Sequence, residues 1–267
     1  MALTYSHHEG RESFGWDHIT EAMTTVESGT AVGVDYIPEE TRAVAIHEAG
    51  HAAAAHVYME GAESTRLSIR MRAGSLGHHQ ALEKEERFSS WRHEEMARLV
   101  WTLGAMAAEH AFYGENSTGV GGDVQSATAR SAWMVGACAM APDPVTLDGS
   151  FDDETAEETR KRITERLERL GAQIMNRTGG GGPFAHDPIV SVLGDPTQRR
   201  LVAQMLGQSY VHAYNFIAHN KPAVEEIADA LVQRKEIYGN ELVELLDSVG
   251  LKKPELDLTK EETWPIL

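Results

Sequence analysis

The sequence has few of the features that mark secreted and membrane proteins. Its 267 residues include one cysteine, Cys138, so an intramolecular disulfide is excluded and nothing favours an oxidising compartment. The N-terminus has neither the basic start nor the apolar centre of a secretory signal peptide. No uninterrupted apolar run approaches the roughly 20 residues that a membrane-spanning helix needs. We therefore expect a cytoplasmic chain without a membrane segment.

Positive charge and aromatic residues are also scarce. The chain has 24 Lys and Arg residues against 41 Asp and Glu residues, which gives a formal net charge of −17. This excess of negative charge argues against a general nucleic-acid-binding surface, because such a surface must neutralise phosphates. Aromatic residues make up 7% of the chain, whereas alanine-rich stretches such as HAAAAH favour helices.

The hydrophobic pattern predicts a mainly α-helical fold with a small β-sheet. Apolar and polar residues alternate from Thr65 to Arg72, which predicts a half-buried strand, and His78 to Leu82 is a candidate second strand. The polar residues 1–15 predict a poorly ordered start, and the glycine-rich residues 178–187 predict a loop or linker. Helices are predicted over residues 16–28, 38–58, 91–113, 123–140, 152–175, 197–219, 222–234 and 239–249.

The string HEAGH at residues 47–51 lies inside the predicted helix that begins at Pro38. Residues four apart share one face of a helix, so His47 and His51 can reach the same ion. Zinc accepts such nitrogen ligands, and a catalytic zinc site usually keeps one position for water. Glu48 follows the first ligand and is a candidate general base for that water. Gly50 lowers helix propensity, which suggests that another part of the chain approaches closely there.

The third ligand has to come from another segment. His56 has the wrong spacing, and Glu94 and Glu95 belong to a charged stretch that is typical of a solvated helix face. Asp123 follows a glycine-rich loop and begins an apolar helix, where an aspartate can also serve as an N-cap. On spacing alone, Asp123 and Glu109 are equal candidates.

Several segments together resemble the peptidase domain of the FtsH-type AAA zinc proteases. IHEAGHA resembles the zinc helix of that family, and RAGSLG at 72–77 resembles its turn between strands. Residues 103–135 are similar to one stretch of that family. In the family this stretch consists of an alanine-glutamate helix, a Ser-Thr-Gly loop, an aspartate and an Ala-Thr helix. Residues 222–248 look like the family's C-terminal helices, and residues 16–29 resemble the last helix of its ATPase module.

The resemblance implies that His47, His51 and Asp123 bind Zn²⁺ and that Glu48 is the general base. It implies that Glu109 is not a zinc ligand, and that it either supports the ligands from outside or belongs to the helix alone. It also implies a homo-hexamer, an AAA ATPase module in the same chain or a separate one, and unfolded polypeptide as substrate. The substrate would lie as an extended strand along a sheet edge, which we expect near Leu67 to Arg72.

The resemblance divides the chain into three parts. Residues 1–36 resemble the end of an ATPase module, residues 37–249 form the zinc peptidase domain, and residues 250–267 are a polar tail. Residues 142–196 depart from the family pattern and are interpreted as a divergent insertion. Gly122 replaces the family's usual Asn, and His110 replaces an acidic residue. The sequence also has no GxxxxGK[S/T] phosphate-binding loop, so this chain is not expected to hydrolyse ATP by that machinery.

The sequence therefore predicts a zinc-dependent endopeptidase for unfolded or damaged proteins, as the proteolytic part of an FtsH-like protease. One alternative is a non-catalytic zinc-binding assembly or scaffold domain of the same fold. A second alternative is a zinc aminopeptidase that acts on small peptides. The presence of Glu48 favours an enzyme over a scaffold, and a strand that can pair with extended backbone favours an endopeptidase.

Overall fold

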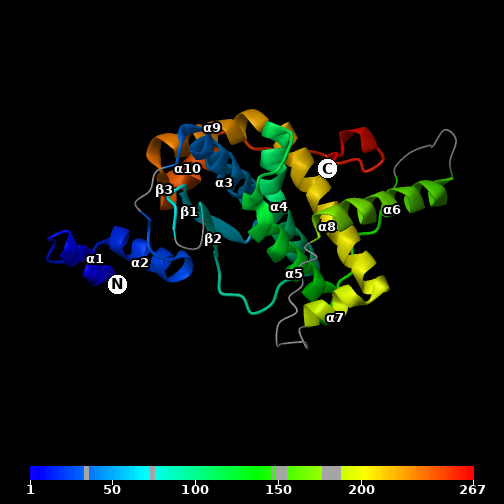
Figure 1. Cartoon of the computed structure of the whole chain (residues 1–267), viewed down its shortest axis with the longest axis horizontal. Helices are drawn as coiled ribbons and strands as arrows, with labels where there is room; N and C mark the ends of the chain where they lie inside the picture. The colour runs from blue at the N-terminus through cyan, green and yellow to red at the C-terminus, as the bar shows by residue number, and fades with distance from the viewer. Residues whose placement is uncertain (33–35, 73–75, 146, 148–154, 176–187) are drawn as a thin grey trace.

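Helices make up most of the structure, a computed structural model that describes residues 1–32, 36–72, 76–145, 147, 155–175 and 188–267 (Figure 1). The prediction of a mainly α-helical fold with a small sheet is confirmed. None of the described helices combines the length and apolar character needed to cross a membrane. The helices are α1 (Ala2–His8), α2 (Trp16–Ser28), α3 (Pro38–Tyr58), α4 (Arg92–Tyr113), η1 (Thr118–Val120), α5 (Gly121–Ala137), α6 (Ala156–Ile174), α7 (Pro188–Gly194), α8 (Pro196–His219), α9 (Lys221–Arg234), α10 (Gly239–Ser248) and η2 (Glu261–Thr263).

Local sequence signals explain where the central helices begin and end. Pro38 occupies the first turn of α3, where its missing N–H costs nothing, and Glu39 and Glu40 complement the positive end of the helix. Helix α4 ends at Gly114, which adopts the left-handed conformation with a φ of 77°. Predicted and observed bounds of these two helices agree within one residue.

The structure departs from the sequence-based expectations at the N-terminus and adds elements that the sequence did not predict. Residues 2–8 form α1 rather than a poorly ordered start, because Ser6 is buried and its hydroxyl donates to the Ser13 carbonyl at 2.8 Å. The short helix α7 and the three-residue strand β3 (Glu236–Tyr238) were too short to show a clear period. Cys138 lies in the apolar run 133–141 and was expected to be buried, but it is partly exposed at the end of α5. The predicted loop at 178–187 lies outside the described residues.

The sheet has three antiparallel strands in the order β2-β1-β3. Strand β1 (Ala62–Ser68) pairs with β2 (His78–Glu83) on one side and with β3 on the other. The expectation of a substrate-binding edge near Leu67 to Arg72 is therefore wrong. Leu67 pairs with both neighbours, and the Ile69 N–H donates to the Lys235 carbonyl. Among the described strands, β2 and β3 are the edges.

The core lies where α3, α4 and α8 pack against one another and against the sheet. Helix α6, from the segment that departs from the family pattern, also contributes to this core, since Ile163 and Leu167 are fully buried. It lies along α8 at the end of the molecule opposite α1 and α2 (Figure 1). A side chain at Gly171 would collide with the Ala203 carbonyl, so the two helix backbones are in close contact.

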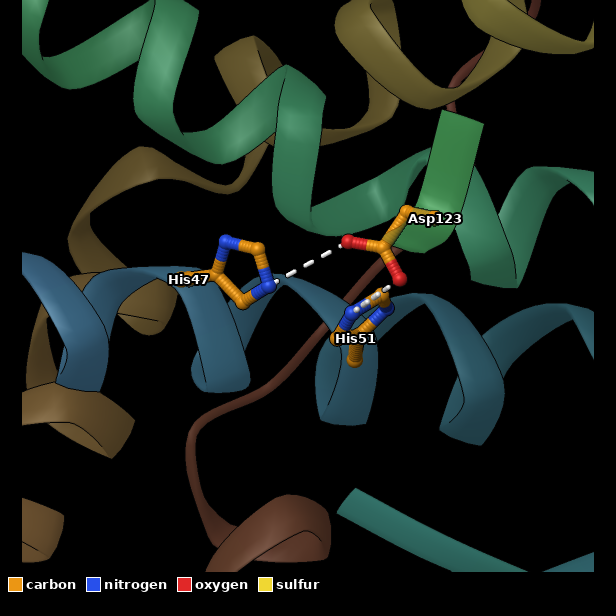
Figure 2. A group of neighbouring side chains, drawn as sticks. All are labelled: His47, His51 and Asp123. Carbon is orange, nitrogen blue, oxygen red and sulfur yellow. Dashed lines mark ion pairs between the residues drawn. The ribbon is translucent and has the colours of Figure 1, made fainter. Parts of the chain in front are cut away.

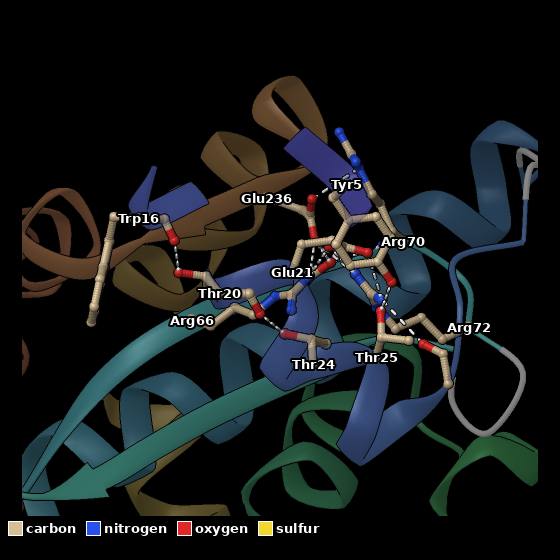
Figure 3. Close-up of polar contacts among 12 residues, drawn as sticks. Tyr5, Trp16, Thr20, Glu21, Thr24, Thr25, Arg66, Arg70, Arg72 and Glu236 are labelled. Carbon is tan, nitrogen blue, oxygen red and sulfur yellow. Dashed lines mark hydrogen bonds and ion pairs between the residues drawn. The ribbon is translucent and has the colours of Figure 1, made fainter. Parts of the chain in front are cut away.

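The N-terminal helices are attached to the sheet by buried ion pairs (Figure 3). The Arg72 guanidinium donates to both carboxylate oxygens of Glu21 on α2, at 3.0 and 2.7 Å. Arg66, whose side chain is fully buried on β1, contacts the same carboxylate at 3.7 Å and also bonds Glu236 on β3. The Tyr5 hydroxyl on α1 is hydrogen-bonded to the Thr25 hydroxyl at 2.7 Å. Charges this deeply buried need their partners, so α2 and the sheet are held in one arrangement.

Replacing Glu21 by Gln should lower the free energy of unfolding by up to about 3 kcal/mol, because two buried guanidinium groups lose a charged partner. The measurement is urea unfolding followed by circular dichroism. Glu12→Gln is the matched control, since Glu12 is exposed on the same N-terminal segment. Equal stability of the two variants would contradict this role of the ion pairs.

Candidate metal centre

Helix α3 presents His47 and His51 on one face, one turn apart (Figure 2). The centroids of the two imidazole rings are 5.1 Å apart, and the ring planes are nearly perpendicular. Both rings point toward the start of α5, where Asp123 lies (Figure 2). The helix spacing and the shared direction of the rings therefore meet the first requirement for a common ligand site.

Asp123 lies between the two imidazoles. Its Oδ2 is 3.3 Å from His47 Nε2, and its Oδ1 is 3.4 Å from His51 Nε2. One ligand atom from each of the three residues lies within 4.8 Å of the others. Asp123 is inside the first turn of α5 rather than at its N-cap, which is Val120. The capping alternative for this aspartate therefore does not apply.

The second ring nitrogen of each histidine is held by a separate acceptor. His47 Nδ1–H donates to Glu109 Oε1 at 2.8 Å, and His51 Nδ1–H donates to the Trp101 carbonyl at 3.0 Å. Glu109 is fixed in turn by the N–H and the hydroxyl of Ser117, at 2.6 and 3.0 Å. With Nδ1 donating to these acceptors, each Nε2 faces Asp123 and becomes free to bind a metal ion when it loses its proton. Metal-bound histidines usually have such an outer acceptor, so the donor set fits a metal ion.

The charges of the centre favour a cation. Burial would lower the pKa of His47, but the carboxylates of Asp123 and Glu109 raise it to about 10. Burial would raise the pKa of Asp123, but the two imidazoles hold it well below its usual range. The centre therefore attracts positive charge, and a metal ion must displace protons from the imidazoles in order to bind.

Glu48 lies beside the three residues and is 5% exposed. Burial raises the pKa of its carboxyl group above the usual value, against the opposing effect of the two imidazoles. Its carboxylate packs against Gly77, where any side chain would collide with it. Glu48 is therefore confined next to the centre, as a general base must be. This role of Gly77 depends on a tertiary contact and was not predicted.

A cleft of about 1130 Å³ opens over these residues. Its walls include Gly77 and, from the beginning of β2, His78 and His79, so an edge strand runs along one side. Trp133 on α5 also lines the cleft and is half exposed. An extended chain of several residues can enter a cleft of this size and shape.

Close packing of α3 on α4 brings the outer acceptors within reach. A methyl group at Gly50 would lie 2.6 Å from the Gly104 carbonyl oxygen, and one at Gly104 would lie 2.7 Å from the Gly50 carbonyl oxygen. The close approach suggested by Gly50 is thus made by the backbone of α4. The sequence did not identify Gly104 as its counterpart, although a second glycine in a long predicted helix was a visible signal.

The comparison with known families agrees with this geometry. The family model of Peptidase family M41 matches residues 36–178, more than half of the chain. The chain belongs to this family. The resemblance to the FtsH-type peptidase domain is thereby confirmed, and the M41 match assigns the chain to a family of metalloproteases.

Curated relatives are named ATP-dependent zinc metalloproteases FtsH. FtsH 4 of Sphaerobacter thermophilus is 34% identical over 171 residues, which cover 59% of this chain and 26% of that protein. FtsH of Thermotoga maritima is 26% identical over 240 residues, covering 89% of this chain and 36% of the relative. FtsH of Rubrobacter xylanophilus is 26% identical over 257 residues, which cover 94% of this chain and 35% of the relative. The M41 chain thus spans about a quarter to a third of these relatives.

Replacing Gly50 by Ala should destabilise this M41 chain by about 1–3 kcal/mol, because the added methyl group forces α3 and α4 apart. Gly121→Ala is the matched control: Gly121 is helical and has no atom within 4 Å of an added methyl group, so this change should be neutral or stabilising. Thermal unfolding of both variants tests the difference. A Gly50 variant as stable as the control would show that the helices do not need this contact.

Proposed function

We propose that this chain is a zinc-dependent endopeptidase and the proteolytic part of an FtsH-like protease. His47, His51 and Asp123 are the proposed zinc ligands, and Glu48 is the proposed general base. The observation that carries the proposal is the donor set, in which two Nε2 atoms and one carboxylate face a common point while both Nδ1 atoms are held by outer acceptors. This pattern is typical of a zinc site with three protein ligands.

When bound, Zn²⁺ supplies a Lewis acid that makes water acidic enough to react near neutral pH and polarises the peptide carbonyl. Glu48 takes the proton of that water and passes it to the leaving amine. Its burial against Gly77 keeps the carboxylate close to the reacting atoms and away from bulk solvent. Glu109 and the Trp101 carbonyl hold the hydrogen on Nδ1 of the two histidines, which keeps each Nε2 available for the metal.

The cleft favours an extended polypeptide as substrate. Strand β2 is an edge of the sheet and contributes His78 and His79 to the cleft wall. We propose that substrate backbone adds to this edge rather than to β1. The support is that β1 is already paired on both sides. An unfolded segment can adopt the extended conformation that this mode requires, whereas a folded protein cannot.

The wider assembly is proposed by analogy with the relatives. In this proposal residues 37–249 form the peptidase domain, residues 1–36 are the end of an ATPase module, and residues 250–267 are a tail. The M41 match within residues 36–178 supports the position of the catalytic segment. An AAA ATPase module, a homo-hexamer and a cytoplasmic location complete the proposal, with unfolded or damaged proteins as substrates.

Glu48→Gln should retain zinc and lose cleavage of unfolded casein by about 100-fold or more, since a general base contributes roughly 10²–10⁴ to the rate. Bound zinc and casein cleavage are measured on the parent and the variant. Zinc binding by the parent without any cleavage would support the scaffold alternative. Faster cleavage of dipeptides than of casein would support the aminopeptidase alternative.

Asp123→Ala should abolish tight zinc binding, whereas Glu109→Gln should weaken it by about 10–100-fold, the usual effect of losing an outer acceptor. Competition with a chromophoric chelator measures both affinities. The reverse order, with zinc lost from the Glu109 variant and kept by the Asp123 variant, would make Glu109 the third ligand.

A further inference from the structure

His79 is a buried histidine that the proposed reaction does not use. It lies on β2 and reaches two other elements, with Nε2 2.9 Å from the Ser64 hydroxyl on β1 and Nδ1 3.0 Å from the indole Nε1 of Trp101 on α4. The Trp101 indole can only donate, so Nδ1 of His79 is the acceptor and its hydrogen is on Nε2. Burial lowers the pKa of His79 well below its usual value, which keeps the ring neutral in this arrangement.

A bulge in β1 makes this contact possible. The register of β1 against β2 shifts between Ser64 and Arg66, so Ser64 is paired with Ala81 and Leu67 with His79. Strict alternation would place Ser64 on the same face as Arg66, which contacts Glu21 on α2. The extra residue turns Ser64 toward His79 instead, and bulges often re-aim side chains in this way next to functional sites.

Trp101 connects His79 to the metal centre. Its indole N–H donates to His79, and its backbone carbonyl accepts the Nδ1–H of His51 at 3.0 Å. The indole also packs edge-on against both imidazoles, with ring centroids 6.4 Å from His51 and 5.8 Å from His79. The chain of contacts therefore runs from the sheet through one residue of α4 to a proposed metal ligand.

The two proposed histidine ligands, His47 and His51, differ in how the acceptors of their Nδ1–H groups are held in place. Glu109 is a side chain, and it is locked by two hydrogen bonds from Ser117. The acceptor of His51 is a main-chain carbonyl within α4, so its position follows the helix backbone. The residue whose carbonyl accepts from His51 is also bonded to the sheet, through the indole N–H that donates to His79.

We propose that His79 and Trp101 are positioning residues for His51, which hold the Trp101 carbonyl where it keeps His51 Nε2 directed at the metal. This inference rests on the proposed zinc site. It extends the site to a residue pair on β2 and α4 that is not among the proposed metal ligands.

The test uses the full chain and the Trp101→Phe variant, which keeps an aromatic ring but loses the indole N–H. Zinc affinity should fall by about 10-fold or more, as expected for a disturbed outer acceptor. The visible absorption bands of the Co²⁺-loaded protein should also change, because they report the geometry around the metal. The zinc affinity and the Co²⁺ spectrum are both measured well below the unfolding temperature of the variant, so that unfolding does not change either result.

Trp91→Phe is the matched control, since Trp91 is 70% exposed at the start of the same helix. It should match the parent in zinc affinity and in the Co²⁺ spectrum. If Trp101→Phe also matched the parent in both, the pair would be structural only and the inference would be overturned. If the parent itself bound no zinc, the proposed function would fall and this inference with it.

A measurement on the parent covers the case in which the variant does not fold. Nitrogen-15 NMR of the histidine rings should find the hydrogen of His79 on Nε2, and zinc should shift the indole N–H resonance of Trp101. A hydrogen on Nδ1 of His79, or an indole resonance that zinc leaves unmoved, would overturn the inference.

Discussion

The distance between α3 and α4 is the constraint on which the centre depends. Gly50 and Gly104 allow the two backbones to touch, each carbonyl lying where the other residue would carry its side chain. At that separation, α4 supplies the acceptors for both histidines, Glu109 for His47 and the Trp101 carbonyl for His51. A hydrogen bond weakens steeply over a fraction of an ångström, so a wider spacing would release both rings. The helix pair thus determines ring orientation before any metal binds.

The electrostatic balance of the centre explains why such an arrangement can exist inside a protein. Glu48, Glu109 and Asp123 place three carboxylates around two imidazoles, with little exposure to solvent. Uncompensated negative charge of this kind is costly to bury. Protonation of His47 compensates part of it in the metal-free protein, as its raised pKa indicates. A divalent cation compensates more, so metal binding and the stability of the fold are coupled.

Much of the centre could be predicted from the sequence, because its strongest signals are local. The spacing of His47 and His51 sets their shared face, and Pro38 marks the start of their helix. Spacing could not choose between Asp123 and Glu109, since the choice depends on how α5 and α4 approach α3. The resemblance favoured Asp123, whose carboxylate oxygens lie 3.3 and 3.4 Å from the two Nε2 atoms. Trp101, His79 and Gly77 were missed because each acts through tertiary contacts, and the edge strand was misplaced because β3 arrives from a distant segment.

Because of the bulge in β1, the two faces of this strand make different contacts. Leu67 and Ser64 face the helices, where Ser64 fixes His79, while Arg66 faces α2 and joins its ion pairs. Without the extra residue, a polar group next to the centre and a buried cation under α2 would compete for the same side of the sheet. Because both contacts depend on the same short strand, a displacement of α2 that pulled on Arg66 would act on the segment that holds His79. The N-terminal helices and the proposed zinc site therefore both contact β1, through Arg66 on one face and Ser64 on the other.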